Sequence, residues 1–139
     1  MADLISPSDL ADFVPLMPIP DDVVEKVGDI PPLVYVRRSA IIGVVDLGES
    51  CHVRFGAGIF TVQNQFAALA KALVGDDNLF FHSTVDLDDG ETRNVLLNRQ
   101  QVVGLVQLHD GVRVVTAAGL YDLHDDIRLI IQAANGLAS

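Results

Sequence analysis

Two stretches of equal length decide the fold: LVYVRRSAIIGVVDLGESCHVRFGAGIFTVQNQFAALAKALVG at residues 33–75 and NVLLNRQQVVGLVQLHDGVRVVTAAGLYDLHDDIRLIIQAANG at residues 94–136. Placed one beneath the other without a gap, at an offset of 61 residues, they share ten identical pairs out of 43. Three of the pairs are glycines at separate turns or bends, which a shared bias toward Val and Ala would not readily produce. The sequence therefore predicts a tandem duplication.

Each copy predicts the same order of elements. A short strand runs into a polar corner, a strand rich in β-branched residues follows, and a tight turn leads to its partner. A glycine then interrupts the pattern before one more short strand, and apolar residues at helical spacing close the copy, with a glycine placed for a C-terminal cap. The expected strands are residues 34–36, 41–47, 51–55 and 59–62, then 95–97, 102–108, 112–116 and 120–123; the expected helices start at Phe66 and Ile127 and stop before Gly75 and Gly136.

The segments outside the copies have a different composition. Residues 1–32 hold all six prolines, and Pro31-Pro32 opposes regular sheet pairing there. Residues 79–87 are typical of an extra strand that turns at Asp88-Asp89-Gly90. We predict an α+β fold made of two pseudo-repeated antiparallel β units, each closed by a C-terminal helix. The segments are an extended, acidic, proline-rich arm (1–32), a β-rich repeat with its helix (33–75), an acidic connector with the extra strand (76–93) and the second repeat with its helix (94–139).

The composition indicates one globular domain. Half of the 139 residues are hydrophobic, which excludes a disordered tail and is enough to build a core without disulfides. Cys51 is the lone cysteine, which fits a reducing compartment. We see neither a signal peptide nor an apolar run long enough to cross a membrane, so we expect a cytoplasmic protein, or a virion protein if a phage encodes it.

The charge is strongly negative and unevenly distributed. Nine basic and 19 acidic residues give a net charge of −10, and residues 1–32 and 76–93 account for −6 and −5. Because such a field repels phosphate, we expect no nucleic acid as a partner. The local exception is a small basic spot that Arg37-Arg38 could form with Arg54, although a few surface arginines are more often solvated or paired.

An acidic run invites comparison with a calcium loop. Asp86, Asp88, Asp89 and Glu91 surround Gly90, but an EF-hand needs its glycine in the sixth place and a bidentate carboxylate in the twelfth. Counted from Asp86, Gly90 is fifth and a leucine is twelfth. We interpret the run as the tip of an acidic hairpin, with no metal site.

Other candidate chemistries lack their partners. Cys51 and His52 are neighbours on a predicted strand, so their side chains point to opposite faces and cannot form a thiolate pair. The remaining histidines are scattered without metal-binding spacing, and the fragment at residues 55–59 has two glycines but lacks the third glycine and the strand-to-helix context of a dinucleotide loop. These histidines are His82, His109 and His124. We predict no enzyme activity, no catalytic residues and no cofactor.

The second unit resembles the small flagellar FlbD-type domain. The likeness lies in residues 84–106, TVDLDDGETRNVLLNRQQVVGLV, which give a hairpin, a Leu-Asn corner and an apolar strand, and it extends over about residues 84–133. The resemblance implies a compact, non-enzymatic module, a pattern that short β-rich bacterial and phage proteins share. Two copies and a proline-rich arm depart from it, so a flagellar role is not carried over.

These features favour a non-enzymatic structural or interaction protein. We expect it to self-assemble or to dock on a larger complex, for example as a capsid or tail component of a bacteriophage virion, through the arm and an open sheet edge. The partner-binding residues would be the apolar side chains of the arm, Phe13, Val14, Leu16, Met17 and Ile19. The alternative is a regulatory binding module that senses a ligand or a protein partner.

Overall fold

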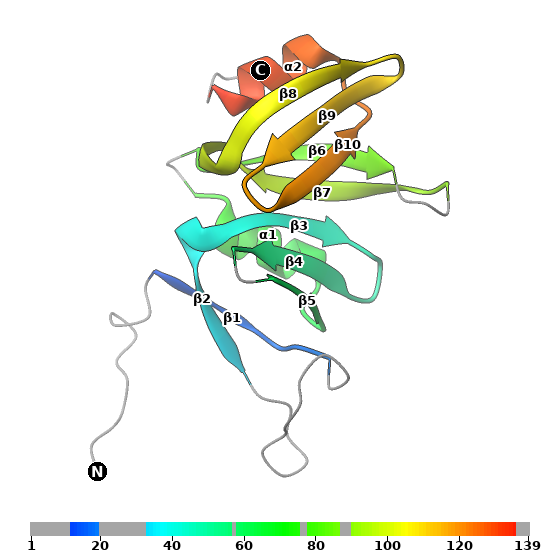
Figure 1. The fold of residues 1–139 in the computed structure, drawn as a ribbon. Helices are drawn as coiled ribbons and strands as arrows, with labels where there is room; N and C mark the ends of the chain where they lie inside the picture. The colour runs from blue at the N-terminus through cyan, green and yellow to red at the C-terminus, as the bar shows by residue number, and fades with distance from the viewer. Residues whose placement is uncertain (1–11, 20–32, 57, 76–77, 87–89, 136–139) are drawn as a thin grey trace, which may run out of the picture.

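A computed structural model describes residues 12–19, 33–56, 58–75, 78–86 and 90–135 (Figure 1). The chain is β-rich with two helices, and its strands pair antiparallel, as predicted. The strands are β1 (Phe13–Leu16), β2 (Val34–Arg37), β3 (Ile41–Asp46), β4 (Cys51–Phe55), β5 (Gly58–Val62), β6 (Phe80–Asp86), β7 (Thr92–Asn98), β8 (Val102–Leu108), β9 (Gly111–Thr116) and β10 (Gly119–Leu123). The helices are α1 (Phe66–Leu73) and α2 (Ile127–Ala134), with short 3-10 turns η3 (Arg38–Ala40) and η4 (Arg99–Gln101).

Eight of these strands form one sheet in the order β5-β4-β3-β7-β6-β10-β9-β8. Its middle joins the two halves of the chain, because β7 pairs with β3 on one side and with β6 on the other. The sheet continues from β6 to β10 through the single register pair Leu123 with Val85, and there the upper three strands turn away from the rest (Figure 1). The two halves therefore meet at an angle, which creates the hollow described below.

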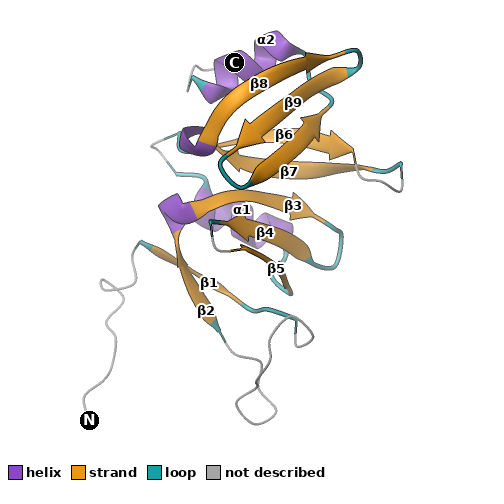
Figure 2. Cartoon of the chain, in the orientation of Figure 1, coloured by secondary structure: helices purple, strands orange, loops and turns teal. Residues whose placement is uncertain are grey.

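Two hydrophobic cores lie on opposite faces of the sheet, and the central strand serves both. On β7, Leu96 belongs to the core beneath α1, whereas Val95 and Leu97 belong to the core beneath α2. This follows from the alternation of side chains along a strand that is covered on both faces. In Figure 2, α1 lies against the β3–β5 half and α2 beside β8 and β9.

The amino-terminal strand packs on its own chain. β1 pairs with β2 in a separate two-stranded sheet, and Val14 and Leu16 are buried in the core that holds α1. Further along, the amide of Ile19 donates to the carbonyl of Thr61 at 2.9 Å. The extended arm was predicted over 1–32, but of that range only residues 12–19 lie in the described part of the chain, and these extend the fold rather than project from it.

Elements 61 residues apart have matching bounds. α1 and α2, η3 and η4, and β5 and β10 each coincide after that shift. A register shift occurs between Ile41 and Gly43 in the pairing of β3, and at the corresponding pair Val102 and Gly104 in that of β8. The β2 and β7 strands differ, because β7 begins earlier, at Thr92, and pairs with β6 and β3 in the large sheet.

The expected glycine cap of the first helix is wrong. The structure ends α1 at Leu73, with Val74 in an extended conformation, and Gly75 is not among the glycines with positive φ. The helix therefore ends without the left-handed glycine cap that the sequence suggested. Gly136 lies outside the described residues.

Candidate functional site

The hollow between the two halves is a pocket of about 360 Å³, which we call the junction pocket. Strands β3 and β4 of the first half supply one wall, and β9 and β10 of the second half supply the other, with the end of β6 between them. The lining residues are Val45, His52, Arg54, Val85, Asp86, Arg113, Leu120, Tyr121 and Asp122. The volume lies within the range of about 300–1,000 Å³ that is typical of small-molecule sites.

Arg54 reaches across the junction pocket from β4 to β10. Its guanidinium carbon lies 4.8 Å from the centre of the Tyr121 ring, a cation–π distance. The same guanidinium occupies the space that a side chain at Gly119 would need, and Gly119 has a φ of 155°, which favours glycine. Its Nη1 atom is buried and has no hydrogen-bond partner in the structure. A buried N–H group without an acceptor lowers the stability of a folded protein, and such groups are rare in native structures.

Tyr121 anchors the second half on the first. Its ring is buried, and its hydroxyl group lies over Gly43 on β3, where a Cβ atom would collide with it. Burial raises the pKa of Tyr121 above its ordinary value, and the positive charge of Arg54 partly opposes that shift. The phenol therefore stays neutral at physiological pH and contributes its ring face to Arg54.

Arg113 and Asp122 form a two-point ion pair on neighbouring strands. Arg113 Nε donates to Asp122 Oδ1 at 2.7 Å and Nη2 donates to Oδ2 at 3.1 Å. This hydrogen bonding, opposed by partial burial and helped by the charge of Arg113, lowers the pKa of Asp122 below its ordinary value. Sequence reasoning missed the pair, although the hairpin at residues 117–118 places Arg113 opposite Asp122 and could have indicated it.

Asp86 is held by neighbours at the end of β6. Its Oδ1 atom accepts from Thr92 Oγ1 at 3.2 Å and lies 2.5 Å from Nε2 of His124. On the same corner, Ser83 Oγ donates to Asp125 Oδ2 at 2.5 Å. These contacts fasten the start of α2 to β6 and leave Asp86 engaged within the chain.

A second feature is an edge on which the two 3-10 turns lie side by side. The Asn98 side chain is buried and donates to the carbonyls of Ser39 at 3.0 Å and Ile41 at 2.9 Å, which binds η4 to η3. The two turns hold no acidic residue, and we call their polar members the turn edge: Arg38, Ser39, Arg99, Gln100 and Gln101. Arg38 bonds the carbonyl of Leu73 through Nε at 3.0 Å, and Arg99 bonds that of Asn78 through Nε at 2.8 Å.

The arm residues proposed as partner contacts have different environments. Val14 and Leu16 are buried in the chain's own core, Phe13 and Ile19 are half-buried, and Met17 is exposed. The guanidinium carbon of Arg37 also lies over Phe13, 4.8 Å from the centre of the Phe13 ring. A partner-binding role for these five residues stays a prediction, and the internal packing leaves Val14 and Leu16 almost no exposed surface for a partner.

The predicted basic spot does not assemble. Arg37 pairs with Asp12 at 2.9 Å, Arg38 lies 5.6 Å from the Phe80 ring centre, and Arg54 lies over Tyr121. Phe80 belongs to the core beneath α1 and Tyr121 to the core on the opposite face, so Arg38 and Arg54 are directed to different sides of the sheet.

Cys51 lies in the core, as predicted, while its neighbour His52 is exposed and lines the junction pocket. Burial, with a smaller contribution from Asp46, raises the pKa of the Cys51 thiol to about 11.

In the part of the chain that is described, no group of three His, Cys, Asp or Glu side chains is placed to hold a metal ion. The acidic run at residues 86–91 is described only in part, because residues 87–89 lie outside the described residues. The two-glycine fragment joins β4 to β5 in a hairpin.

The comparisons with known proteins give one finding about fold. No protein-family profile matches the sequence, and no curated protein is significantly similar to it. Among solved structures, the chain is similar to the LytTr DNA-binding domain of a Bacillus cereus protein described as a methyl-accepting/DNA response regulator. The likeness covers 91% of this chain and 98% of the other, with a TM-score of 0.53 and 12% sequence identity, and it therefore shows the fold. None of the described helices is long and apolar enough to cross a membrane.

This likeness overturns two expectations from the sequence. The chain was expected to be a structural protein that assembles or docks on a complex such as a phage virion, and its fold is instead that of a domain described as DNA-binding. The expectation that nucleic acid is excluded is wrong on the same ground. It relied on a net charge of −10 for the whole chain, whereas residues 1–32 and 76–93 together contribute −11 and the rest of the chain contributes +1. A whole-chain charge is a poor guide when the acids are gathered in two segments.

Proposed function

We propose that this chain is a regulatory DNA-binding module. The observation that carries the proposal is the likeness of its fold, over 91% of its length, to a DNA-binding domain of a response regulator. The sequence left a regulatory binding module as the alternative function. The proposed function is regulatory as well, but its partner is DNA and not a ligand or a protein.

The charge of the β units is compatible with this function. Residues 33–75 and 94–136 together contain seven basic and six acidic side chains, so the body of the fold is nearly neutral. Its basic groups are arginines apart from Lys71, and arginine is the side chain that best pairs with phosphate and with guanine edges. A nearly neutral body makes few phosphate contacts, so we expect modest affinity with a shallow dependence on salt.

The turn edge is the surface that we assign to DNA. It places two arginines, two glutamines and a serine on neighbouring turns, and Gln100 is exposed. Arginine contacts phosphate or guanine, and glutamine can bind an adenine edge through both of its amide atoms. The turns are fixed to one another through the buried Asn98, so these groups are held in place before DNA binds.

The test is selection of duplex DNA from a random-sequence pool, followed by fluorescence anisotropy with an enriched duplex over a range of salt concentrations. We expect enrichment of a defined sequence and a slope of log K against log salt of about −2, since two arginines would neutralise about two phosphates. The double variant Arg99→Gln with Gln100→Ala should weaken binding about tenfold or more and make the slope shallower by about one.

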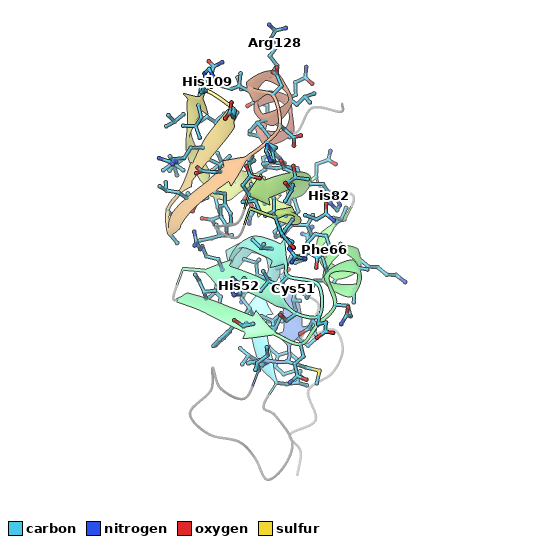
Figure 3. The ribbon with its side chains drawn as sticks, turned by 90° about the vertical axis from the view of Figure 1, so that its right-hand side faces the viewer. Cys51, His52, Phe66, His82, His109 and Arg128 are labelled. Carbon is cyan, nitrogen blue, oxygen red and sulfur yellow. The ribbon has the colours of Figure 1, made fainter. Side chains whose placement is uncertain are left out.

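The matched control carries the same two changes on α2, Arg128→Gln with Gln132→Ala. Both residues are exposed, and Figure 3 shows Arg128 at the outer end of the molecule, pointing away from it. This control should bind like the parent chain. A pool that yields no enriched sequence, together with no anisotropy change at low salt, would contradict the function itself; equal loss in both double variants would contradict only the turn edge.

We also propose that the chain arose by duplication of a β-rich unit, with segments at residues 1–32, 33–75, 76–93 and 94–139. The matching bounds and the paired register shifts at an offset of 61 residues support this proposal. The FlbD-type resemblance, a cytoplasmic location and the lack of enzyme activity stay predictions. Refolding residues 76–139 alone would test the division, because a unit of independent origin should retain the β6–β10 sheet and α2.

A further inference from the structure

We propose that the junction pocket binds a small oxyanion ligand, a phosphate monoester or a carboxylate with a compact apolar body, and that Arg54 is the group that recognises the anion. This inference does not depend on DNA binding. It rests on the hydrogen bonding, charge and shape of the junction pocket.

The first observation is the state of the Arg54 guanidinium. Its Nη1 atom is buried without a hydrogen-bond partner, and the described part of the chain gives this side chain neither a hydrogen bond nor an ion pair. Guanidinium donors form a planar fork that matches the two oxygens of a carboxylate or a phosphate. The ring of Tyr121 below and the backbone of Gly119 beside it hold the group in one place. An oxyanion in the junction pocket would give this guanidinium the anionic partner that it lacks in the described part of the chain.

The second observation is that the other lining charges are already engaged. Arg113 is bound at two points by Asp122, and the Asp86 carboxylate accepts from Thr92 and contacts His124. Among the described lining residues, Arg54 is therefore the cation that still lacks an anionic partner. This argues for an anion as the ligand, with one charged group and not several.

The third observation is the apolar surface in the same hollow. Val45 and Val85 belong to the core beneath α2, and Leu120, at the mouth of the junction pocket, is 52% exposed. Sites for small molecules combine such apolar walls with a few fixed polar groups. A ligand with an apolar body would cover Leu120 while its anionic group meets Arg54.

The location gives such a ligand a regulatory effect. Val45, His52 and Arg54 come from the first half of the chain, and Leu120 and Tyr121 from the second, so the ligand would contact both halves. A ligand that binds the folded protein alone also stabilises it by mass action. Binding would therefore hold the angle between the halves and raise the thermal midpoint.

The experiment is an NMR titration of the full-length chain, enriched in ¹⁵N, with four separate probes: phenyl phosphate, benzoate, inorganic phosphate and phenol. Each probe is added up to about 10 mM, enough to approach saturation for a Kd near 1 mM. We expect saturable amide shifts at residues 52–54 and 119–122 with phenyl phosphate or benzoate, weaker binding of inorganic phosphate, and no saturable shift with phenol. Binding of one aromatic anion and not the other identifies the phosphate or the carboxylate as the ligand group.

Two variants separate recognition from folding. Arg54→Gln should weaken the binding of the preferred anion at least tenfold, because a charged hydrogen bond is lost, whereas Arg128→Gln removes an exposed arginine elsewhere and should bind like the parent. If Arg54→Gln fails to fold, the shift map of the parent chain still decides the matter. The proposal is overturned by absent or non-saturable shifts at residues 52–54 and 119–122, by phenol binding as well as the anions, or by a folded Arg54→Gln variant of unchanged affinity.

Discussion

The hydroxyl oxygen of Tyr121 lies 2.5 Å from the position that a Cβ atom on Gly43 would occupy. The two residues belong to β10 and β3, which are separated in the sheet by β7 and β6. They meet because the upper strands turn over the face of the lower ones, and the small size of Gly43 makes room for the phenol. This contact fixes how the two halves of the chain approach each other and so shapes the junction pocket.

Gly43→Ala should therefore destabilise the protein by about 1–3 kcal/mol, the usual cost of overpacking. The added methyl group would collide with the hydroxyl and ring of Tyr121 and crowd Leu97. Gly104 is its counterpart 61 residues later, where a methyl group would meet Val115 at an ordinary 3.7 Å, so Gly104→Ala is the matched control. Urea unfolding measures the free energy of unfolding of both variants. Equal values would show that Tyr121 can move away from the added methyl group without loss of stability.

Asp126→Ala should destabilise α2 by about 1 kcal/mol, because the Asp126 carboxylate caps the helix by accepting from the amide of Arg128 at 2.8 Å. Gln65 holds the equivalent position before α1 and makes no capping hydrogen bond with its side chain. Gln65→Ala should leave stability nearly unchanged. Thermal unfolding followed by circular dichroism compares the two, and a similar loss in both would refute the capping role.

Cys51 should be unreactive in the folded chain. It is completely buried, and its pKa is raised to about 11, so both access and thiolate formation are suppressed near pH 8. A thiol reagent such as Ellman's should label it rapidly in guanidinium chloride and slowly in buffer.

The pKa of the thiol in the unfolded chain is near 8.5–9, about two units below its pKa in the folded chain. The Cys51 thiol therefore contributes to the free energy of unfolding below about pH 9, and this contribution is lost as pH rises toward 11. Fast labelling under native conditions would contradict the buried placement.

The Arg113 and Asp122 pair should give a small pH-dependent contribution to stability, since both side chains are more than a third exposed. The pKa of folded Asp122 is lowered below the unfolded value of about 3.9, so its contribution is present above that value and is lost as pH falls through the folded pKa. The stability gap between the parent and Asp122→Asn should be constant from pH 7 to about pH 5 and close below about pH 4. Urea titrations over this range measure it, with Asp110→Asn, an exposed turn residue, as control. A gap that widens on acidification would reverse the assigned sign.

The sequence allowed prediction of the local elements but not of the site. The helix at Phe66–Leu73 and the strand at Cys51–Phe55 follow from apolar spacing within about ten residues, and both lie where that spacing placed them. The sequence singled out Arg54 only for a basic spot that does not assemble and His52 only as the neighbour of Cys51, and no motif marked Tyr121. Their shared pocket joins segments about 70 residues apart in the chain, and such proximity has no signature within a single strand.

By itself, the sequence determined the order of the strands and helices between residues 34 and 134, the matched glycines at an offset of 61 residues and the opposite faces of Cys51 and His52. These are properties of short-range periodicity and backbone freedom, which a few neighbouring residues dictate. Only the tertiary structure decided that β7 joins the two halves, that residues 13–16 pair with β2 inside the chain, and that Tyr121 rests on Gly43. Strand pairing and packing between distant segments depend on which surfaces fit together, and that choice is made by the energy of the whole fold.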